Sequence, residues 1–156
     1  MPIKYSIPEI ERRWLVNLAD VAQLEAMPFQ LIEDRYLAET HLRLRKIVMA
    51  DQQIVFKLGK KYGKTSEVSQ PITNLYIDAQ EYATLAKLDA AVATKRRYSV
   101  QGGSLDVYVE PNAGFAVFEV EFVTEEAAKD YAPPVFVGEE ITTSSHYSGY
   151  ALARVP

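Results

Sequence analysis

The chain has 156 residues, of which 48% are hydrophobic and 24% charged, and its net charge is -4 at pH 7. These values predict one soluble globular domain over residues 1–156, and the absence of cysteine excludes disulfides and thiolate metal sites. The chain has no basic excess for nucleic acid, no apolar run near the roughly 20 residues of a membrane span and no leader-like N-terminus, so we expect a cytoplasmic protein.

Taken in chain order, the predicted elements are mostly β-strands, because charged and apolar residues alternate along them. We expect strands over residues 5–16, 31–37, 40–49, 54–59, 95–100, 105–109 and 115–123, with a last one around 140–142. Short helices are expected over residues 20–26 and 124–130, each with a capping residue at its start, and a longer amphipathic helix over 78–93. The pair Gly102-Gly103 predicts a hairpin turn, and residues 59–64 predict a mobile basic loop.

Like-signed charges recur two residues apart within these strands, and residues at that spacing share one face of a strand. The pairs are Glu9/Glu11 (followed by Arg13), Arg43/Arg45, Lys95/Arg97 and Glu119/Glu121. The opposite face is apolar, as Phe118, Val120 and Phe122 show for the last pair. A sheet with one charged and one apolar face predicts closure into a barrel with an ionic, water-filled lumen, and the lumen would be the working site.

A single charged pair of this kind is more often a solvated surface than a binding site, because exposed ion pairs contribute well under about 1 kcal/mol. The ensemble favours the lumen, since acids cluster on the first and late strands and bases on the strands between them. His41 and His146 are isolated and are expected at the surface. Lys60, Lys61 and Lys64 are expected in a solvated loop, with a lid over the tunnel mouth as the alternative.

Short motifs in this order resemble the CYTH superfamily, also called triphosphate tunnel metalloenzymes, and in particular its short bacterial members. Residues 9–16 (EIERRWLV) resemble the ExExK signature of the family, with Arg13 in the place of the lysine. The later matches are residues 42–45 (LRLR), 56–59 (FKLG), 95–98 (KRRY), 118–121 (FEVE) and 137–142 (VGEEIT). Each motif is weak by itself, but the ordered set covers most of the chain and is specific.

The resemblance implies an α+β fold, a closed antiparallel β-barrel of about eight strands, with a few helices outside and room for a small ligand inside. It implies one domain that binds a linear triphosphate with Mg²⁺ or Mn²⁺, and homodimers are common in the family. Carried over to this sequence, the catalytic and metal-binding acids are Glu9, Glu11, Glu119 and Glu121, with Glu67 and Glu140 as additional metal ligands. The substrate-binding cations are Arg13, Arg43, Arg45, Lys57, Lys95 and Arg97.

The chain departs from the family pattern at several positions. Arg13 replaces a lysine, Ser69 stands where a second acid is often found, and Asp34-Arg35 stands in place of a glutamine-glycine pair. The charge at position 13 is kept but not its geometry, because a guanidinium fork reaches two oxygens where an ammonium is a point charge.

Physical chemistry supports the same ligand class. Arginine forks match phosphate oxygens, carboxylates suit Mg²⁺, and a cage of cations can stabilise a phosphoryl group in transfer while a water attacks it. The leading hypothesis is a divalent-metal-dependent hydrolase of the phosphoanhydride bond in inorganic triphosphate, or in an organic triphosphate such as a nucleoside or thiamine triphosphate. The alternatives are a non-catalytic module that binds triphosphate or polyphosphate and an adenylate cyclase of the class IV type.

Overall fold

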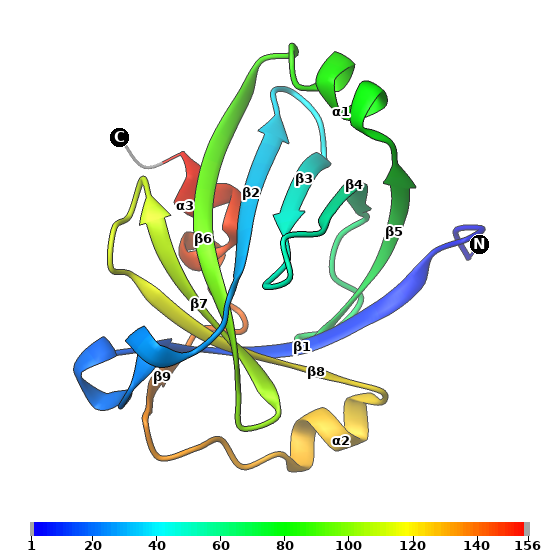
Figure 1. Cartoon of the computed structure of the whole chain (residues 1–156). Helices are drawn as coiled ribbons and strands as arrows, with labels where there is room; N and C mark the ends of the chain where they lie inside the picture. The colour runs from blue at the N-terminus through cyan, green and yellow to red at the C-terminus, as the bar shows by residue number, and fades with distance from the viewer. Residues whose placement is uncertain (1, 155–156) are drawn as a thin grey trace.

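A closed antiparallel barrel forms the body of the protein in the computed structural model, which describes residues 2–154 (Figure 1). Eight strands close the barrel in the order β5-β4-β3-β2-β6-β7-β8-β1, because β1 also pairs with β5. The ninth strand, β9, pairs with β1 beside this ring. The strands are β1 (Ile7–Val16), β2 (Gln30–Leu37), β3 (Leu42–Val48), β4 (Ile54–Lys61), β5 (Ser69–Ile77), β6 (Ala90–Val100), β7 (Gly103–Glu110), β8 (Ala116–Phe122) and β9 (Val137–Glu140). The predicted fold class is confirmed.

The apolar core lies on the outer face of the barrel wall. Trp14, Leu105 and Phe118 are almost completely buried there, and residues from 18–27 and 131–137 pack over them. Trp14 alternates along β1 with Glu11 and Arg13, so core and lumen lie on opposite faces of the same strand. Burial of the apolar face thereby fixes which side chains point into the tunnel.

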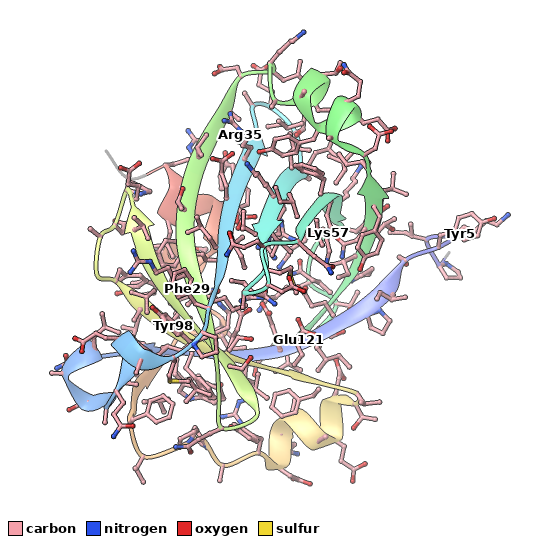
Figure 2. The ribbon with its side chains drawn as sticks, viewed as in Figure 1. Tyr5, Phe29, Arg35, Lys57, Tyr98 and Glu121 are labelled. Carbon is pink, nitrogen blue, oxygen red and sulfur yellow. The ribbon has the colours of Figure 1, made fainter. Side chains whose placement is uncertain are left out.

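The aromatic side chains of the outer wall are drawn in Figure 2. Phe29 and Tyr98 pack with their ring centroids 5.6 Å apart, and Tyr5 projects away from the barrel at the N-terminal end of the chain. None of the described helices is long and apolar enough to cross a membrane.

The helix predicted over residues 78–93 is shorter than expected. Helix α1 (Ala79–Leu85) begins with a capping box between Asp78 and Glu81 and ends well before the predicted end. The alanine-rich stretch that follows is the start of β6, where Ala91 and Ala93 pair with β2. Strand pairing has overridden the helix propensity of these alanines, a tertiary effect that local sequence does not carry.

The other short elements agree with the sequence in part. Helix α2 (Glu125–Asp130) is capped by Thr124 as predicted, whereas residues 20–26 form no α-helix but parts of two 3-10 turns, Leu18–Asp20 and Leu24–Ala26. Strand β9 ends at Glu140, earlier along the chain than predicted, and the C-terminal part forms helix α3 (Gly149–Ala153). The hairpin turn at Gly102 is confirmed, with a positive φ of 78°.

The first half of the predicted basic loop at 59–64 is a strand. Strand β4 continues to Lys61, which pairs with Ile72 of β5. The extension places Lys61 in register with the lumen-facing side of the barrel, and not in a solvated loop.

Candidate active site

A cavity of about 620 Å³ occupies the lumen and is lined by charged side chains from both ends of the chain. Among the predicted site residues, those that line it are Glu9, Glu11, Arg13, Arg43, Arg45, Lys95, Arg97, Glu119 and Glu121. Acids and bases that are far apart in sequence therefore line the same cavity.

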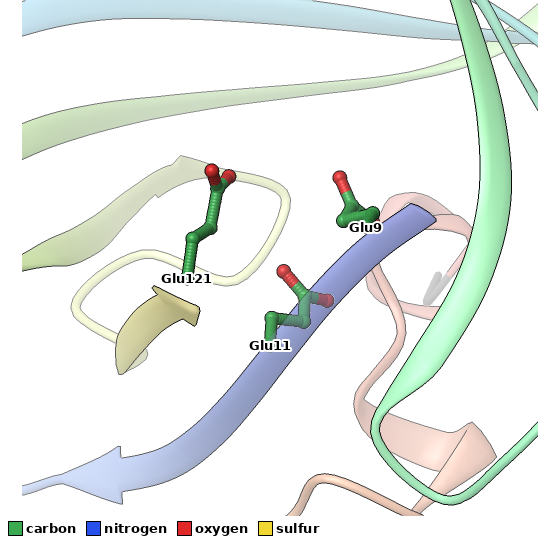
Figure 3. Close-up of side chains that lie close together, drawn as sticks. All are labelled: Glu9, Glu11 and Glu121. Carbon is green, nitrogen blue, oxygen red and sulfur yellow. The ribbon is translucent and has the colours of Figure 1, made fainter. Parts of the chain in front are cut away.

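Three carboxylates form an acidic cluster at one side of this cavity (Figure 3). Glu9 and Glu11 come from β1 and Glu121 from β8, and one oxygen of each lies within 4.8 Å of the others. Figure 3 shows the side chains converging because Glu11 and Glu121 are direct partners across the strand pair. Lys61, from β4, provides a close counter-charge, with its Nζ 2.7 Å from Glu9 Oε1.

The cluster carries unfavourable negative charge. Burial, together with nearby Glu119 and Glu9, raises the pKa of Glu11 to about 7, although Lys61 opposes the shift. Burial and the same kind of repulsion also raise the pKa of Glu121. A group of oxygen donors with too little positive charge fits a hard divalent cation such as Mg²⁺ or Mn²⁺.

Glu119 belongs to the basic side of the cavity and not to the acidic cluster. Arg97 Nη2 donates to Glu119 Oε1 at 2.5 Å, and Arg13 Nε lies 3.7 Å from Glu119 Oε2. Burial opposes ionisation of Glu119, but these guanidinium groups keep its pKa below the usual value. Of the four acids predicted as catalytic and metal-binding, Glu9, Glu11 and Glu121 therefore come together as a possible metal site, and Glu119 does not.

Two buried aspartates, which the sequence analysis did not identify as site residues, hold the basic residues in place. Asp34 accepts both arms of the Arg45 guanidinium, at 2.5 and 2.8 Å, and Arg43 Nε lies 3.7 Å from Asp34 Oδ1. Burial opposes ionisation, but the two arginines keep the pKa of Asp34 well below its usual range. Asp34 therefore remains charged and fixes the direction of Arg45.

Asp106, on β7, holds the basic residues Lys95 and Arg97 in the same way. Its carboxylate lies 2.6 Å from Lys95 Nζ and accepts two hydrogen bonds from Arg97, both of 2.7 Å. Only 1% of Asp106 is exposed, and Lys95 and Arg97 keep its pKa well below normal despite that burial. The signal for both aspartates was present in strand parity, since Asp34 lies two residues before Tyr36 and Asp106 two residues before Tyr108, on the same inward faces.

Arg43 has a hydrogen-bond donor that is not satisfied within the described residues. Its Nε is buried and has no hydrogen-bond partner among the described residues, because Asp34 is too far away for a good bond. A buried donor without a partner is costly, so an anionic oxygen in the cavity is a favourable partner for this side chain.

Three predicted site residues are not among those that line the cavity. Lys57 Nζ lies over the Tyr76 ring, 5.2 Å from its centroid. Glu67 is exposed and lines a second hollow together with Glu140. Glu140 accepts two hydrogen bonds from Arg12, of 2.7 and 2.9 Å, and these bonds lower its pKa. Lys57 is the direct partner of Arg45 across β3 and β4, so it shares the lumen-facing side of the wall with that arginine. The two glutamates are not brought to the acidic cluster or the arginines.

Lys61 and Lys64, predicted to be solvated, both line the cavity. Lys64 Nζ donates to the backbone carbonyls of Glu67 and Thr142, so it joins the loop after β4 to the chain after β9. His41 is exposed, as expected, but at the edge of the cavity.

The comparisons with known proteins agree with this geometry. No family model matches the chain. The chain is 31% identical to the inorganic triphosphatase of Nitrosomonas europaea, in an alignment that covers 93% of this chain and 96% of that protein. The chain belongs to the CYTH superfamily.

Two solved structures have a fold similar to that of this chain. The crystal structure of the inorganic triphosphatase NE1496 has 26% sequence identity and a TM-score of 0.59, and the match covers 95% of each chain. A conserved hypothetical protein from Pyrococcus furiosus has 20% identity and a TM-score of 0.52, over 78% of this chain and 83% of that one, and supports the fold alone.

Proposed function

We propose that this CYTH protein is a divalent-metal-dependent hydrolase of the phosphoanhydride bond in inorganic triphosphate. One observation carries the proposal: a carboxylate cluster able to hold a cation and a set of fixed arginines face the same cavity. The match to an inorganic triphosphatase over nearly the whole of both chains supports the substrate and a single catalytic domain.

In this proposal Glu9, Glu11 and Glu121 hold Mg²⁺ or Mn²⁺. The donor set suits either ion, because both prefer oxygen ligands and the three carboxylates are already gathered. When bound, the cation offsets charge on the phosphoryl oxygens and acidifies a water.

The phosphate chain is held by the basic side of the cavity. Arg13, Arg43, Arg45, Lys95 and Arg97 supply the donors. Asp34 and Asp106 position four of these five, and Glu119 orients Arg97 and Arg13. Donors that are fixed before the reaction stabilise charge on the transferring group without reorganising, which is the main catalytic demand of phosphoryl transfer. One of the lumen glutamates accepts the proton of the attacking water as its oxygen bonds to the terminal phosphorus, and the phosphoanhydride bond breaks to release phosphate and pyrophosphate.

Lys57, Glu67 and Glu140 are left out of this machinery. Lys57 shares the lumen-facing side with Arg45 but lies over Tyr76 and does not line the cavity, and the two glutamates lie at a separate hollow. The cytoplasmic location and the homodimer remain predictions.

The test is phosphate release from tripolyphosphate, ATP and thiamine triphosphate, each with Mg²⁺, with Mn²⁺ and with a chelator. We expect release from tripolyphosphate that depends on the metal and is faster than release from the organic triphosphates. Thermal stabilisation by tripolyphosphate without release would instead indicate a binding module. Formation of cyclic AMP from ATP would indicate a cyclase.

A further inference from the structure

Lys61 contacts the acidic cluster directly. Its Nζ donates to Glu9 Oε1 at 2.7 Å, and this carboxylate is the partner of the ammonium among the described residues. Glu9 offers an oxygen that lies within 4.8 Å of one from Glu11 and one from Glu121. The ammonium therefore lies at the edge of the group of oxygens that suits a divalent cation.

The position of Lys61 is less constrained than that of the other basic residues in the cavity. Arg45 donates two hydrogen bonds to Asp34, and the Lys95 side chain is only 9% exposed beside Asp106. The Lys61 side chain is 42% exposed and is held by one carboxylate. An ammonium carries three donors on a flexible stem, so Lys61 can turn to another anion without a change in the strand.

The wall that carries Lys61 also carries an arginine of the phosphate-binding side. Gly59, two residues before Lys61 on β4, is the direct partner of Arg43 on β3, so the two cations share the inward face of this wall. Lys61 pairs on its other side with Ile72 of β5, and all three side chains line the cavity. A phosphate chain in the cavity therefore meets Lys61 on the same wall as Arg43.

A divalent cation and a phosphate chain act on opposite members of the ion pair between Lys61 and Glu9. A cation on the Glu9 carboxylate repels the ammonium, because two positive charges would then share one acid. A phosphate that attracts the ammonium leaves Glu9 uncompensated beside two other acids. When both ligands are present, each member of the pair has a new partner of opposite charge.

We infer that Lys61 couples the binding of the divalent cation to the binding of triphosphate, because its ammonium passes from Glu9 to a phosphate oxygen once the carboxylates hold the cation. The inference rests on the proposed function and adds a residue to its machinery. In the empty tunnel Lys61 weakens binding of the cation, and in the loaded tunnel it binds the substrate. Each ligand therefore raises the affinity of the protein for the other.

Two neighbouring lysines provide matched variants. Lys61→Met keeps an unbranched side chain and removes the charge, and Lys61→Gln is a second variant that removes the charge with a polar group. Lys60→Met is the control, because it makes the same change in net charge one residue away. Lys60 is exposed, alternates with Lys61 on β4 and lies with its Nζ over the Tyr62 ring, 5.3 Å from the centroid. Thermal unfolding shows that each variant is folded.

Calorimetry first measures the affinity of each protein for Mn²⁺ alone. It then measures the affinity for an analogue of tripolyphosphate with imido groups in place of the bridging oxygens, which is not hydrolysed, with a chelator and with saturating Mn²⁺. The ratio of the two analogue affinities is the coupling factor. Association of Mn²⁺ with the analogue in solution is the same for every protein, so it cancels when coupling factors are compared.

We expect both Lys61 variants to bind Mn²⁺ alone at least about tenfold more tightly than the wild-type protein, because the competing ammonium is gone. Without metal, their affinity for the analogue should stay within about threefold of wild type, since Lys61 is then occupied by Glu9. With saturating Mn²⁺ it should be at least about tenfold weaker, so the coupling factor falls. Lys60→Met should match the wild-type protein in all three measurements.

Unchanged or weaker binding of Mn²⁺ by both Lys61 variants would overturn the inference. An unchanged coupling factor would do the same, and so would equal effects of Lys60→Met and Lys61→Met. If the wild-type protein releases phosphate from tripolyphosphate with metal and one of these results is found, only this inference is lost. A wild-type protein that binds neither Mn²⁺ nor the analogue loses the proposed function as well.

Discussion

Replacement of Asp106 by Asn tests the idea that buried aspartates hold the cationic wall of the tunnel. The change keeps the size of the side chain but removes its charge, so Lys95 loses the carboxylate 2.6 Å away and Arg97 is left with Glu119 as its acidic partner. Removing one partner of a buried ion pair typically costs about 3–5 kcal/mol, because the other charge stays buried and uncompensated. At roughly 2–4 °C of Tm per kcal/mol for a protein of this size, we expect Tm to fall by about 10 °C.

The assay is thermal and urea unfolding with and without tripolyphosphate, with Glu110→Gln as the control, because Glu110 is an exposed acid on the same strand. Tripolyphosphate should restore more stability to Asp106→Asn than to the wild-type protein, since the phosphate oxygens replace the missing carboxylate. A loss of less than about 1 kcal/mol, or equal stabilisation of both proteins by the ligand, would refute the reasoning.

The remaining predictions concern the acidic cluster, the arginines and the pH dependence. Burial and neighbouring acids raise the pKa of Glu11 from 4.5 to about 7, so ionisation of this side chain destabilises the fold as pH rises through that range. Glu11→Gln should therefore raise the free energy of unfolding above pH 7 by up to about 3 kcal/mol and leave it nearly unchanged below pH 4.5. Unfolding curves taken at each pH measure this difference. Asp34 has a lowered pKa, so its contribution to stability is present at neutral pH and is lost only as pH falls below the usual pKa of an aspartate. Asp34→Asn should therefore flatten the acid side of the plot of unfolding free energy against pH. An unchanged acid side would contradict the ion pairs of Asp34 with the arginines. Arg45→Ala should weaken tripolyphosphate binding at least about tenfold in calorimetry, while Arg35→Ala, on the outer face of β2, should leave it unchanged.

The barrel could be predicted because charged and apolar residues alternate along its strands. The parity of Glu9, Glu11 and Arg13 against Trp14 determines which face is inside, and this information is local. The end of helix α1 could not be predicted, since Ala91 and Ala93 become a strand only through their partners on β2. The same limit applies to Lys61, whose place in β4 depends on pairing with β5.

The candidate site was predicted in its composition but not in its connections. Sequence indicates that Arg45, Arg97 and Glu119 face the lumen, but not that Asp34 and Asp106 neutralise the arginines or that Glu119 pairs with Arg97. The two aspartate contacts depend on the register of the hairpins β2–β3 and β6–β7, which places Asp34 opposite Arg45 and Arg97 opposite Asp106. Alternation within one strand does not specify that register.

Phosphate release by the wild-type protein and by Glu11→Gln, with tripolyphosphate and either Mg²⁺ or Mn²⁺, tests most directly whether the acidic cluster and the arginines act as one site. We expect the wild-type protein to release phosphate only with metal, and Glu11→Gln to lose at least about 100-fold in rate while it still binds tripolyphosphate without metal, because the arginines are intact. Undiminished release by Glu11→Gln, or release by the wild-type protein in the presence of a chelator, would contradict the account.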